Sequence, residues 1–280
     1  MPNKILRLGM TECSLLFIYW LNTYKNIYNN ECVNSKMLLI KWLYTTSGYY
    51  DKTQIGNYFN VIHNNHDTTV YTQYMEIILE FIKNSDYYAF AFHNFTQKEL
   101  IDEFKGIINP KKCYISQQVI YDFIKNKKLL IISPFARLVK HQIDSANYNH
   151  IYSNDTKVEY CLEYTYPYTF FNNGPHNNIL ETAEYNFNLI IQTITEEYDS
   201  VLISCGAYSC LLAKKFYDIG KNVCTIGGDL QTYFGIANGR LKKFNLENNL
   251  EIYHKEYWIL EIPEEYKPVD YMKIENGCYW

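Results

Sequence analysis

Short apolar runs that alternate with amphipathic segments constrain the fold of this chain more than any other feature. The clearest case is DSVLISCGAYSCLLAKKFYDIGKNVCTIGGDLQTYFGI, from Asp199 to Ile236. In chain order it predicts a strand over 200–204, a tight turn at Gly206, a helix through Lys215 that ends at Gly220, a strand over 222–226, and another helix after Gly227 and Gly228. This order is a βαβ unit, which is typical of parallel sheets.

The same alternation extends over the rest of the chain. Strands are predicted at 5–8, 87–92, 112–116, 128–133 (KLLIIS) and 157–164 (KVEYCLEY). Helices are predicted over 35–42, 69–82 and TQKELIDEFK at 96–105, and from Asn177 through Ile194. We therefore expect an α/β fold of the Rossmann-like kind, a mainly parallel sheet with helices on both faces. We expect one domain over 1–280, with a helical region over about 23–86 and a turn-rich insertion over about 143–176.

Charge and hydropathy argue against a nucleic-acid-binding protein and against a membrane-spanning one. The net charge is −4 and no block of basic residues stands out, which argues against a nucleic-acid partner. The apolar run from Cys13 to Leu21 is far shorter than the roughly 20 residues of a membrane span, and no A-x-A cleavage site follows it. We expect a soluble, cytoplasmic protein. If the chain is viral, we expect it in the cytoplasm of the host cell. The 29 tyrosines, with abundant Asn, Ile and Lys, are typical of an AT-rich genome.

Cysteine and histidine give weak signals for a metal. The eight cysteines include no C-x-x-C pair, and several lie in apolar runs, where a free thiol packs as a small hydrophobic group. We infer a reducing compartment. His63 and His66 have a ligand-like spacing but lack the glutamate of the zinc-protease motif, and His141 fits a surface or core-edge position. No metal ligand is predicted.

The opening phrase ILRLGMTE places charged residues at the first predicted turn between a strand and a helix. If Thr11 is the N-cap, Glu12 lies in the first helical turn, where it complements the helix dipole. If the turn binds a ligand, Glu12 faces the crevice in which open α/β sheets hold substrates. The residues of this turn alone leave both interpretations open.

Two further turns resemble the first in position. Ser133 is either an N-cap, with Pro134 at the first helical position, or a donor to a pyrophosphate. Small residues at Ser204, Gly206 and Ala207 would let backbone N–H groups approach a phosphate, although the spacing is neither G-x-G-x-x-G nor a Walker A loop. If the strands are parallel, the turns at Glu12, Ser133 and Gly206 converge on one edge of the sheet.

Taken together, RLGMTE, IISPFARLVKHQ, the Leu202–Ile236 stretch and the terminal IENGCYW resemble, in the same order, segments of GT-D-type glycosyltransferases of surface-polysaccharide pathways and their bacterial and viral relatives. In that family the opening turn typically reads Arg-Phe-Gly-Asp-Gly-Glu, and its Asp-x-Glu pair is associated with the nucleotide sugar and a divalent metal. Arg7, Gly9 and Glu12 match, whereas Met10 replaces the aspartate. Because Mg²⁺ and Mn²⁺ prefer oxygen ligands, this departure puts metal use in doubt.

The resemblance implies transfer of a sugar from a nucleotide-sugar donor to a glycan or lipid-linked acceptor. It implies that Glu12 is catalytic and that Arg7 orients Glu12 or meets a phosphate. The implied donor-binding residues are Arg7, Gly9, Thr11, Ser133, Arg137, Ser204, Gly206, Ala207, Tyr208, Gly227, Gly228 and Gln231. Trp280 would either complete the core, which we expect, or stack on a base or a sugar.

Two alternatives of other classes remain open. One is a catalytically lapsed relative that binds a nucleotide sugar or a partner protein, which Met10 makes credible. The other is a nucleotide-dependent oxidoreductase, which the missing dinucleotide fingerprint disfavours.

Overall fold

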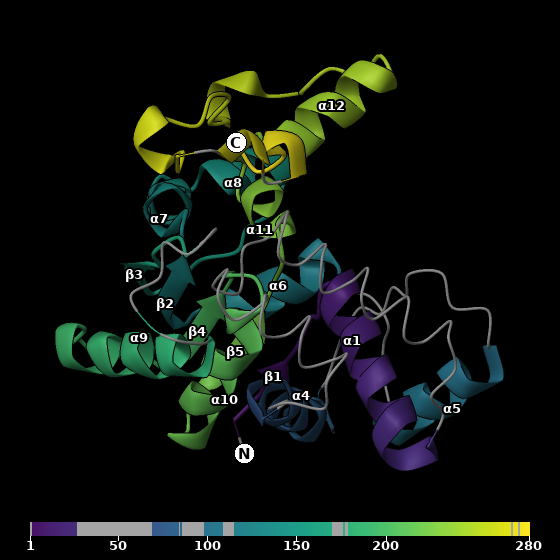
Figure 1. Ribbon diagram of the computed structural model, residues 1–280. Coiled ribbons are helices and arrows are strands. Elements are labelled where there is room, and N and C mark those ends of the chain that lie inside the picture. The colour runs from purple at the N-terminus through teal and green to yellow at the C-terminus, as the bar shows by residue number, and fades with distance from the viewer. Residues whose placement is uncertain are drawn as a thin grey trace.

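The chain forms a five-stranded, all-parallel sheet. A computed structural model describes residues 2–26, 69–83, 85, 98–108, 115–169, 176, 179–269, 271–273 and 275–280 (Figure 1). The strand order across the sheet is β1 (Lys4–Ile5), β5 (Asn222–Thr225), β4 (Ser200–Ile203), β2 (Lys128–Ser133) and β3 (Tyr160–Thr165). Every strand pair is parallel, which confirms the predicted α/β fold.

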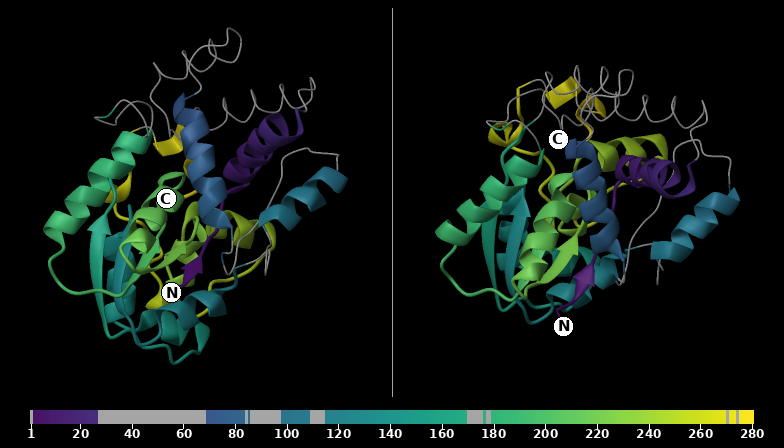
Figure 2. Two further views of the ribbon diagram at one scale, coloured as in Figure 1. Left: turned by 90° about the horizontal axis from the view of Figure 1, so that it is seen from below. Right: turned by 60° about the horizontal axis from the view of Figure 1, so that its bottom comes forward.

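Helices cover both faces of the sheet because the central strands are apolar on both sides. Along β2, Leu130 and Ile132 join one buried cluster, whereas Leu129 and Ile131 join the other. The first face carries α1 (Met10–Trp20), α4 (Thr69–Ile82), α9 (Ile179–Thr193) and α10 (Tyr208–Asp218), as Figure 2 shows. The second carries α6 (Gln117–Ile124), α7 (Ala136–Asp144), α8 (Asn147–Tyr152) and α11 (Asp229–Tyr233).

The remaining elements extend this framework. A π-helical turn, Leu21–Lys25, continues α1, and α5 (Lys98–Ile108) places Phe104 against Phe17 and Trp20. After β5 and α11 come α12 (Gly239–Glu247) and the 3-10 turns Lys255–Tyr257, Glu264–Tyr266, Tyr271–Lys273 and Glu275–Gly277. Among the described helices, none combines the length and the apolar character that crossing a membrane requires.

Most predicted elements within the described residues are confirmed. Helix α4 has the predicted bounds, and β2, β4 and β5 lie at 128–133, 200–203 and 222–225. Strand β3 lies inside the turn-rich stretch and pairs with β2 over its full length. The helix 35–42, the strand 87–92 and most of the strand 112–116 lie outside the described residues.

Two predicted strands differ from the structure. Strand β1 spans Lys4–Ile5 and not 5–8, because Leu6 and Leu8 leave the ladder and are buried against the helices of the first face. Ile115 and Ser116 are not in a strand, since the Ser116 side chain accepts a hydrogen bond from the Val119 N–H and caps α6.

Trp280 and five of the six described cysteines belong to the interior. Trp280 is buried, its indole N–H donates to the Tyr266 carbonyl at 2.7 Å, and its ring contacts Phe135 and Tyr271, which confirms the expected core position. The six described cysteines are free and five of them are buried. Burial raises the pKa of the Cys210 thiol to about 12, so these side chains pack as neutral groups.

Candidate functional site

The predicted functional turns all lie at one edge of the sheet. Glu12 follows β1, Gly206 follows β4 and Ser133 ends β2, and the carboxyl ends of parallel strands share an edge. β2 and β4 are neighbours, and the helices that follow them, α7 and α10, cover opposite faces. Such a change of face is the topological switch point at which open α/β sheets bind ligands. At about 4.8 Å per strand, the ends of β1 and β4 lie roughly 10 Å apart.

The turn after β1 differs in detail from the prediction. The N-cap of α1 is Gly9, which has extended backbone and offers no side-chain cap, so Thr11 lies inside the first turn and is not the N-cap. The first intrahelical bond, from the Cys13 N–H to the Gly9 carbonyl, fixes this start. The Glu12 carboxylate folds back over Gly9, where a Cβ would overlap Oε2.

Glu12 is a buried carboxylate, with only 8% of its surface exposed. A first-turn acid that merely complements a helix dipole is normally solvated, because burying a charge is costly unless partners offset the cost. Glu12 also lies close enough to Cys210, in the first turn of α10, for its charge to raise the pKa of that thiol, although burial of the thiol contributes more. Glu12 therefore stands between β1 and the turn after β4.

Arg7 is fixed at both its backbone and its side chain. Its N–H donates to Thr225 Oγ1 at 2.7 Å, and the same hydroxyl donates to the Arg7 carbonyl at 3.1 Å, which joins β1 to the end of β5. The guanidinium crosses Gly227, where a Cβ would overlap Nη1. Nη2 lies 3.4 Å from Asp229 Oδ2. Sequence reasoning missed Asp229, although its place directly after two glycines at a helix start was a signal.

Gly228 faces a second cationic group. The position of a Cβ on Gly228 lies 2.8 Å from Tyr279 Cε1 and 3.3 Å from Arg240 Nη1. Arg240 stacks over the Tyr279 ring at 4.5 Å, and its Nη2 donates to the Tyr279 hydroxyl at 2.8 Å. Neither residue was predicted as a site residue, because only the folded chain brings α12 and the C-terminal residues beside the turn after β5.

Ser204 and Gln231, both predicted to bind the donor, hold this turn in place. The Ser204 hydroxyl donates to the Gly227 carbonyl at 3.1 Å. Gln231 is buried: its Nε2 donates to the Tyr279 carbonyl at 2.7 Å, and its Oε1 accepts from Asn238 Nδ2 at 3.0 Å. These bonds position the backbone of the two glycines.

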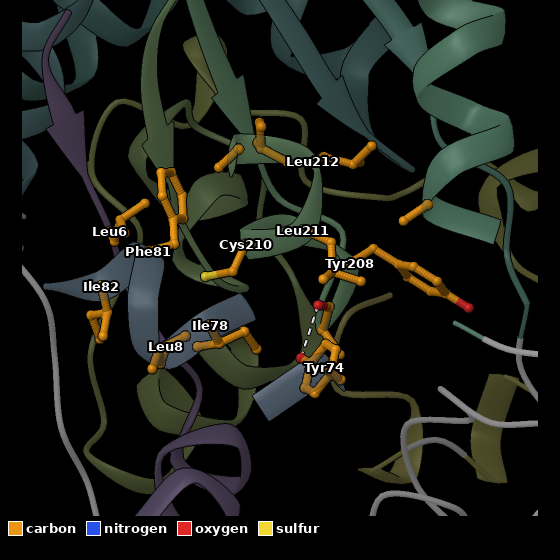
Figure 3. Close-up of a cluster of buried hydrophobic side chains, with 14 of the residues drawn as sticks. Leu6, Leu8, Tyr74, Ile78, Phe81, Ile82, Tyr208, Cys210, Leu211 and Leu212 are labelled. Atoms are coloured by element: carbon orange, nitrogen blue, oxygen red, sulfur yellow. Dashed lines mark hydrogen bonds between the residues drawn. The ribbon is translucent and has the colours of Figure 1, made fainter. Parts of the chain in front are cut away.

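The turn after β4 is internally bonded. Gly206 has φ +60°, the left-handed conformation that glycine adopts without strain, as the predicted tight turn requires. Ala207 and Tyr208 are buried, the Tyr208 hydroxyl lies 2.8 Å from Thr169 Oγ1, and the Tyr74 hydroxyl donates to the Ala207 carbonyl at 3.0 Å (Figure 3). The Ala207 carbonyl and the Tyr208 hydroxyl are therefore engaged within the protein.

The turn after β2 corrects one prediction. Helix α7 begins at Ala136 with Phe135 as its N-cap, so Ser133 is not the cap and Pro134 is not the first helical residue. The buried Ser133 hydroxyl instead accepts from the Phe135 N–H at 3.2 Å and closes a short turn before the helix. Arg137 extends to the surface and pairs with Glu163 on β3 at 3.4 Å.

No metal site emerges from the described part of the chain, where no group of three or more His, Cys, Asp or Glu side chains converges. His141 lies within α7, and His63 and His66 lie outside the described residues. No protein-family model, curated protein or solved structure matches the chain. Its activity must therefore be inferred from its own side chains.

Proposed function

We propose that this protein transfers a sugar from a nucleotide-sugar donor to a glycan or lipid-linked acceptor at the carboxyl edge of the sheet. One observation carries the proposal: Arg7 and the buried Glu12 follow β1, and Arg7 lies directly across Gly227 of the neighbouring strand's turn. A cation, a carboxylate and two glycines are thus brought together at the carboxyl edge of the sheet, one strand away from the switch point between β2 and β4.

The donor's diphosphate would lie against Gly227 and Gly228. Negative charge develops on a departing nucleoside diphosphate as the sugar bond breaks, and fixed positive charge stabilises it. Arg7 supplies that charge, and the absence of a Cβ at Gly227 makes room for its guanidinium, which the phosphate oxygens would meet at this turn. Since Met10 offers no oxygen ligand, we assign the neutralising role at this turn to Arg7 and not to a divalent cation.

Glu12 would act on hydroxyl groups. A buried carboxylate accepts strong hydrogen bonds from sugar or ribose hydroxyls, and it can take the proton of an attacking acceptor hydroxyl. Its burial near α10 keeps water from competing for these bonds. We place the reaction in the cytoplasm, in keeping with the free thiols of the six described cysteines.

A second candidate is a relative that binds a nucleotide sugar without turning it over. Met10 in place of the family's aspartate favours it, because loss of a metal ligand is a direct route to lost chemistry. The internal bonds of Tyr208 and Ser133 are compatible with either candidate, since both hydroxyls take part in hydrogen bonds within the protein.

The two candidates separate in one experiment. Melting temperature is measured with UDP, GDP, CDP and ADP sugars, with and without Mn²⁺, and release of the nucleoside diphosphate is then assayed for every donor that stabilises the protein. Stabilisation with release supports sugar transfer, and stabilisation without release supports the lapsed relative. If no nucleotide sugar raises the melting temperature and NAD alone does, the proposal is wrong and an oxidoreductase is favoured.

A further inference from the structure

Arginine is used very selectively in this chain. The sequence contains three arginines and 23 lysines. Arg7 follows β1, Arg137 begins α7 after β2, and Arg240 lies beside Gly228, which follows β5, so all three stand at the carboxyl edge of the sheet. A guanidinium presents a planar fork of donors that matches a phosphate, whereas a lysine offers a point charge. The concentration of arginine at this edge points to a ligand that is recognised by forked hydrogen bonds.

Two of the three arginines flank one dipeptide. Arg7 Nη1 lies over Gly227, and Arg240 Nη1 lies 3.3 Å from the position of a Cβ on Gly228. Because consecutive Cα atoms are about 3.8 Å apart, both guanidinium groups are within reach of a single diphosphate laid across the dipeptide. Arg137 is not part of this pair, since it binds Glu163 on β3, three strands away from β5.

Both guanidinium groups are held in place. Thr225 bonds the Arg7 backbone, Asp229 pairs with Nη2, and Nη1 lies over the glycine. The Tyr279 ring and hydroxyl support Arg240, and Gln231 in turn anchors the Tyr279 carbonyl. Groups fixed before binding lose less conformational entropy when a ligand arrives.

We infer that Arg7 and Arg240 together bind the diphosphate of a nucleoside-diphosphate ligand across Gly227 and Gly228. Arg240 is then a binding residue, and Tyr279 is the residue that positions it. The inference rests on the proposed function in taking the donor's diphosphate as the ligand. It extends that function by naming the second arginine and by requiring a preference for diphosphate over monophosphate, because one phosphate cannot engage both guanidinium groups equally well.

The test is calorimetry at fixed ionic strength with inorganic pyrophosphate, with ADP, GDP, UDP and CDP, and with the matching monophosphates. Arg240→Gln is expected to weaken diphosphate binding roughly tenfold to a hundredfold, as loss of a charged, forked hydrogen-bond donor does. Monophosphate binding should fall less. Arg240→Lys should restore only part of the affinity, because it keeps the charge without the fork.

Lys243→Gln is the matched control. Lys243 lies on the same helix, is 75% exposed and pairs with Glu247, so its loss removes the same charge away from the glycines. Its diphosphate affinity should stay within about twofold of the wild type, since exposed ion pairs contribute little. Tyr279→Phe, which keeps the ring but removes the hydroxyl that holds Nη2, should weaken binding less than Arg240→Gln does. Melting temperatures of all variants establish that they fold.

The outcomes separate this inference from the proposed function. If Arg240→Gln binds diphosphates as the wild type does, or if the wild type binds none of the probes, the inference is overturned. If diphosphate binding depends on Arg240 but no nucleotide sugar is consumed, the two-arginine site is supported and the proposal of sugar transfer is wrong. If Arg240→Gln consumes a nucleotide sugar as well as the wild type does, sugar transfer is supported and the two-arginine site is wrong.

Discussion

The two halves of the carboxyl edge use polar residues in opposite ways. At the ends of β2 and β4, Ser133 and Tyr208 are buried and their hydroxyls bond to groups of the protein itself. At the ends of β1 and β5, Arg7 and Arg240 keep guanidinium nitrogens beside glycines, and Asp229 is half-exposed. We call these the buried half and the charged half of the edge.

This difference shows that a turn does not bind a ligand merely because it follows a strand at the carboxyl edge of the sheet. Both halves follow parallel strands at one edge, and both contain glycine or small residues. In the buried half those residues let the chain turn and pack, whereas in the charged half they make room for cationic side chains. Mutations that separate stability from ligand binding test this comparison directly.

The largest effect is expected from alkaline pH, acting on buried phenols and thiols across the protein, of which Tyr208 and Cys210 lie in or beside the buried half. Burial raises the pKa of Tyr208 from 10.0 to about 12, and that of Cys210 from 9.0 to about 12. Each group is neutral when protonated, so the folded state holds these protons more tightly than the unfolded state does. Their contribution to stability is complete below about pH 9 and is lost as the pH rises through 12. The midpoint of urea unfolding should therefore fall steeply between pH 9 and 11, and a constant midpoint over that range would contradict the assignment.

Tyr208→Ala should be the most destabilising substitution of a predicted site residue. Truncating a buried aromatic side chain costs about 3–5 kcal/mol of the free energy of unfolding. Tyr208→Phe, which removes the hydroxyl that bonds to Thr169 and Thr182, should cost about 0.5–1.5 kcal/mol per lost bond. Urea unfolding of both variants provides the measurement. If Tyr208→Ala were as stable as the wild type but no longer bound nucleotide, the ligand site would lie in the buried half and not in the charged half.

Gly227→Ala should act mainly on ligand binding. The new methyl group would overlap Arg7 Nη1 and displace the guanidinium, so affinity for a nucleoside diphosphate should fall roughly tenfold to a hundredfold, as for Arg7→Gln.

Gly106→Ala provides the control for that substitution. Gly106 lies in α5 with no atom within 4 Å of the added Cβ. This variant should bind normally and gain about 0.5–1 kcal/mol of stability, as alanine does in a helix. If Gly227→Ala and the wild type bound a nucleoside diphosphate with equal affinity, Arg7 would not be part of the ligand site.

Glu12→Gln should give the smallest change. It keeps the size of the side chain and removes the charge, so donor affinity should fall about fivefold, with little change in melting temperature. A residue that only complements the helix dipole would behave oppositely, losing a few tenths of a kcal/mol and leaving binding intact. Both quantities are measured on the wild type, Glu12→Gln and Met10→Asp, and Met10→Asp should also introduce a dependence on Mn²⁺.

Much of the fold was predictable because buried parallel strands are apolar on both faces. KLLIIS, SVLI and the run through Val223 and Cys224 carry that signal locally, and Gly206 carries the signal for the turn. The order of the strands was not predictable, since nothing near Ile5 indicates that its neighbour is Cys224.

The candidate site was only partly predictable for a related reason. The family resemblance implied Arg7, Gly227 and Gly228 as site residues, and the structure brings Arg7 into contact with Gly227. Arg240 and Tyr279 reach the same place from a helix and a loop that follow the sheet, and their local sequence contains no sign of it. The N-cap alternative for Thr11 and Ser133 is wrong, because a suitable side chain indicates where a helix is able to begin, not where it does begin.

The pairing of β1 with β5 also determines the order in which this protein can assemble during its synthesis. Lys4 and Val223 are partners in the ladder, so the first strand to leave the ribosome must wait for the last. At about 5–20 residues per second, that wait lasts roughly ten to forty seconds. Strands β2, β3 and β4 can pair earlier, which makes them the natural nucleus of the sheet. Helix α1 can pack against α4 and α5 during the wait, but the charged half of the edge forms only after β5 and the residues that follow it have been made.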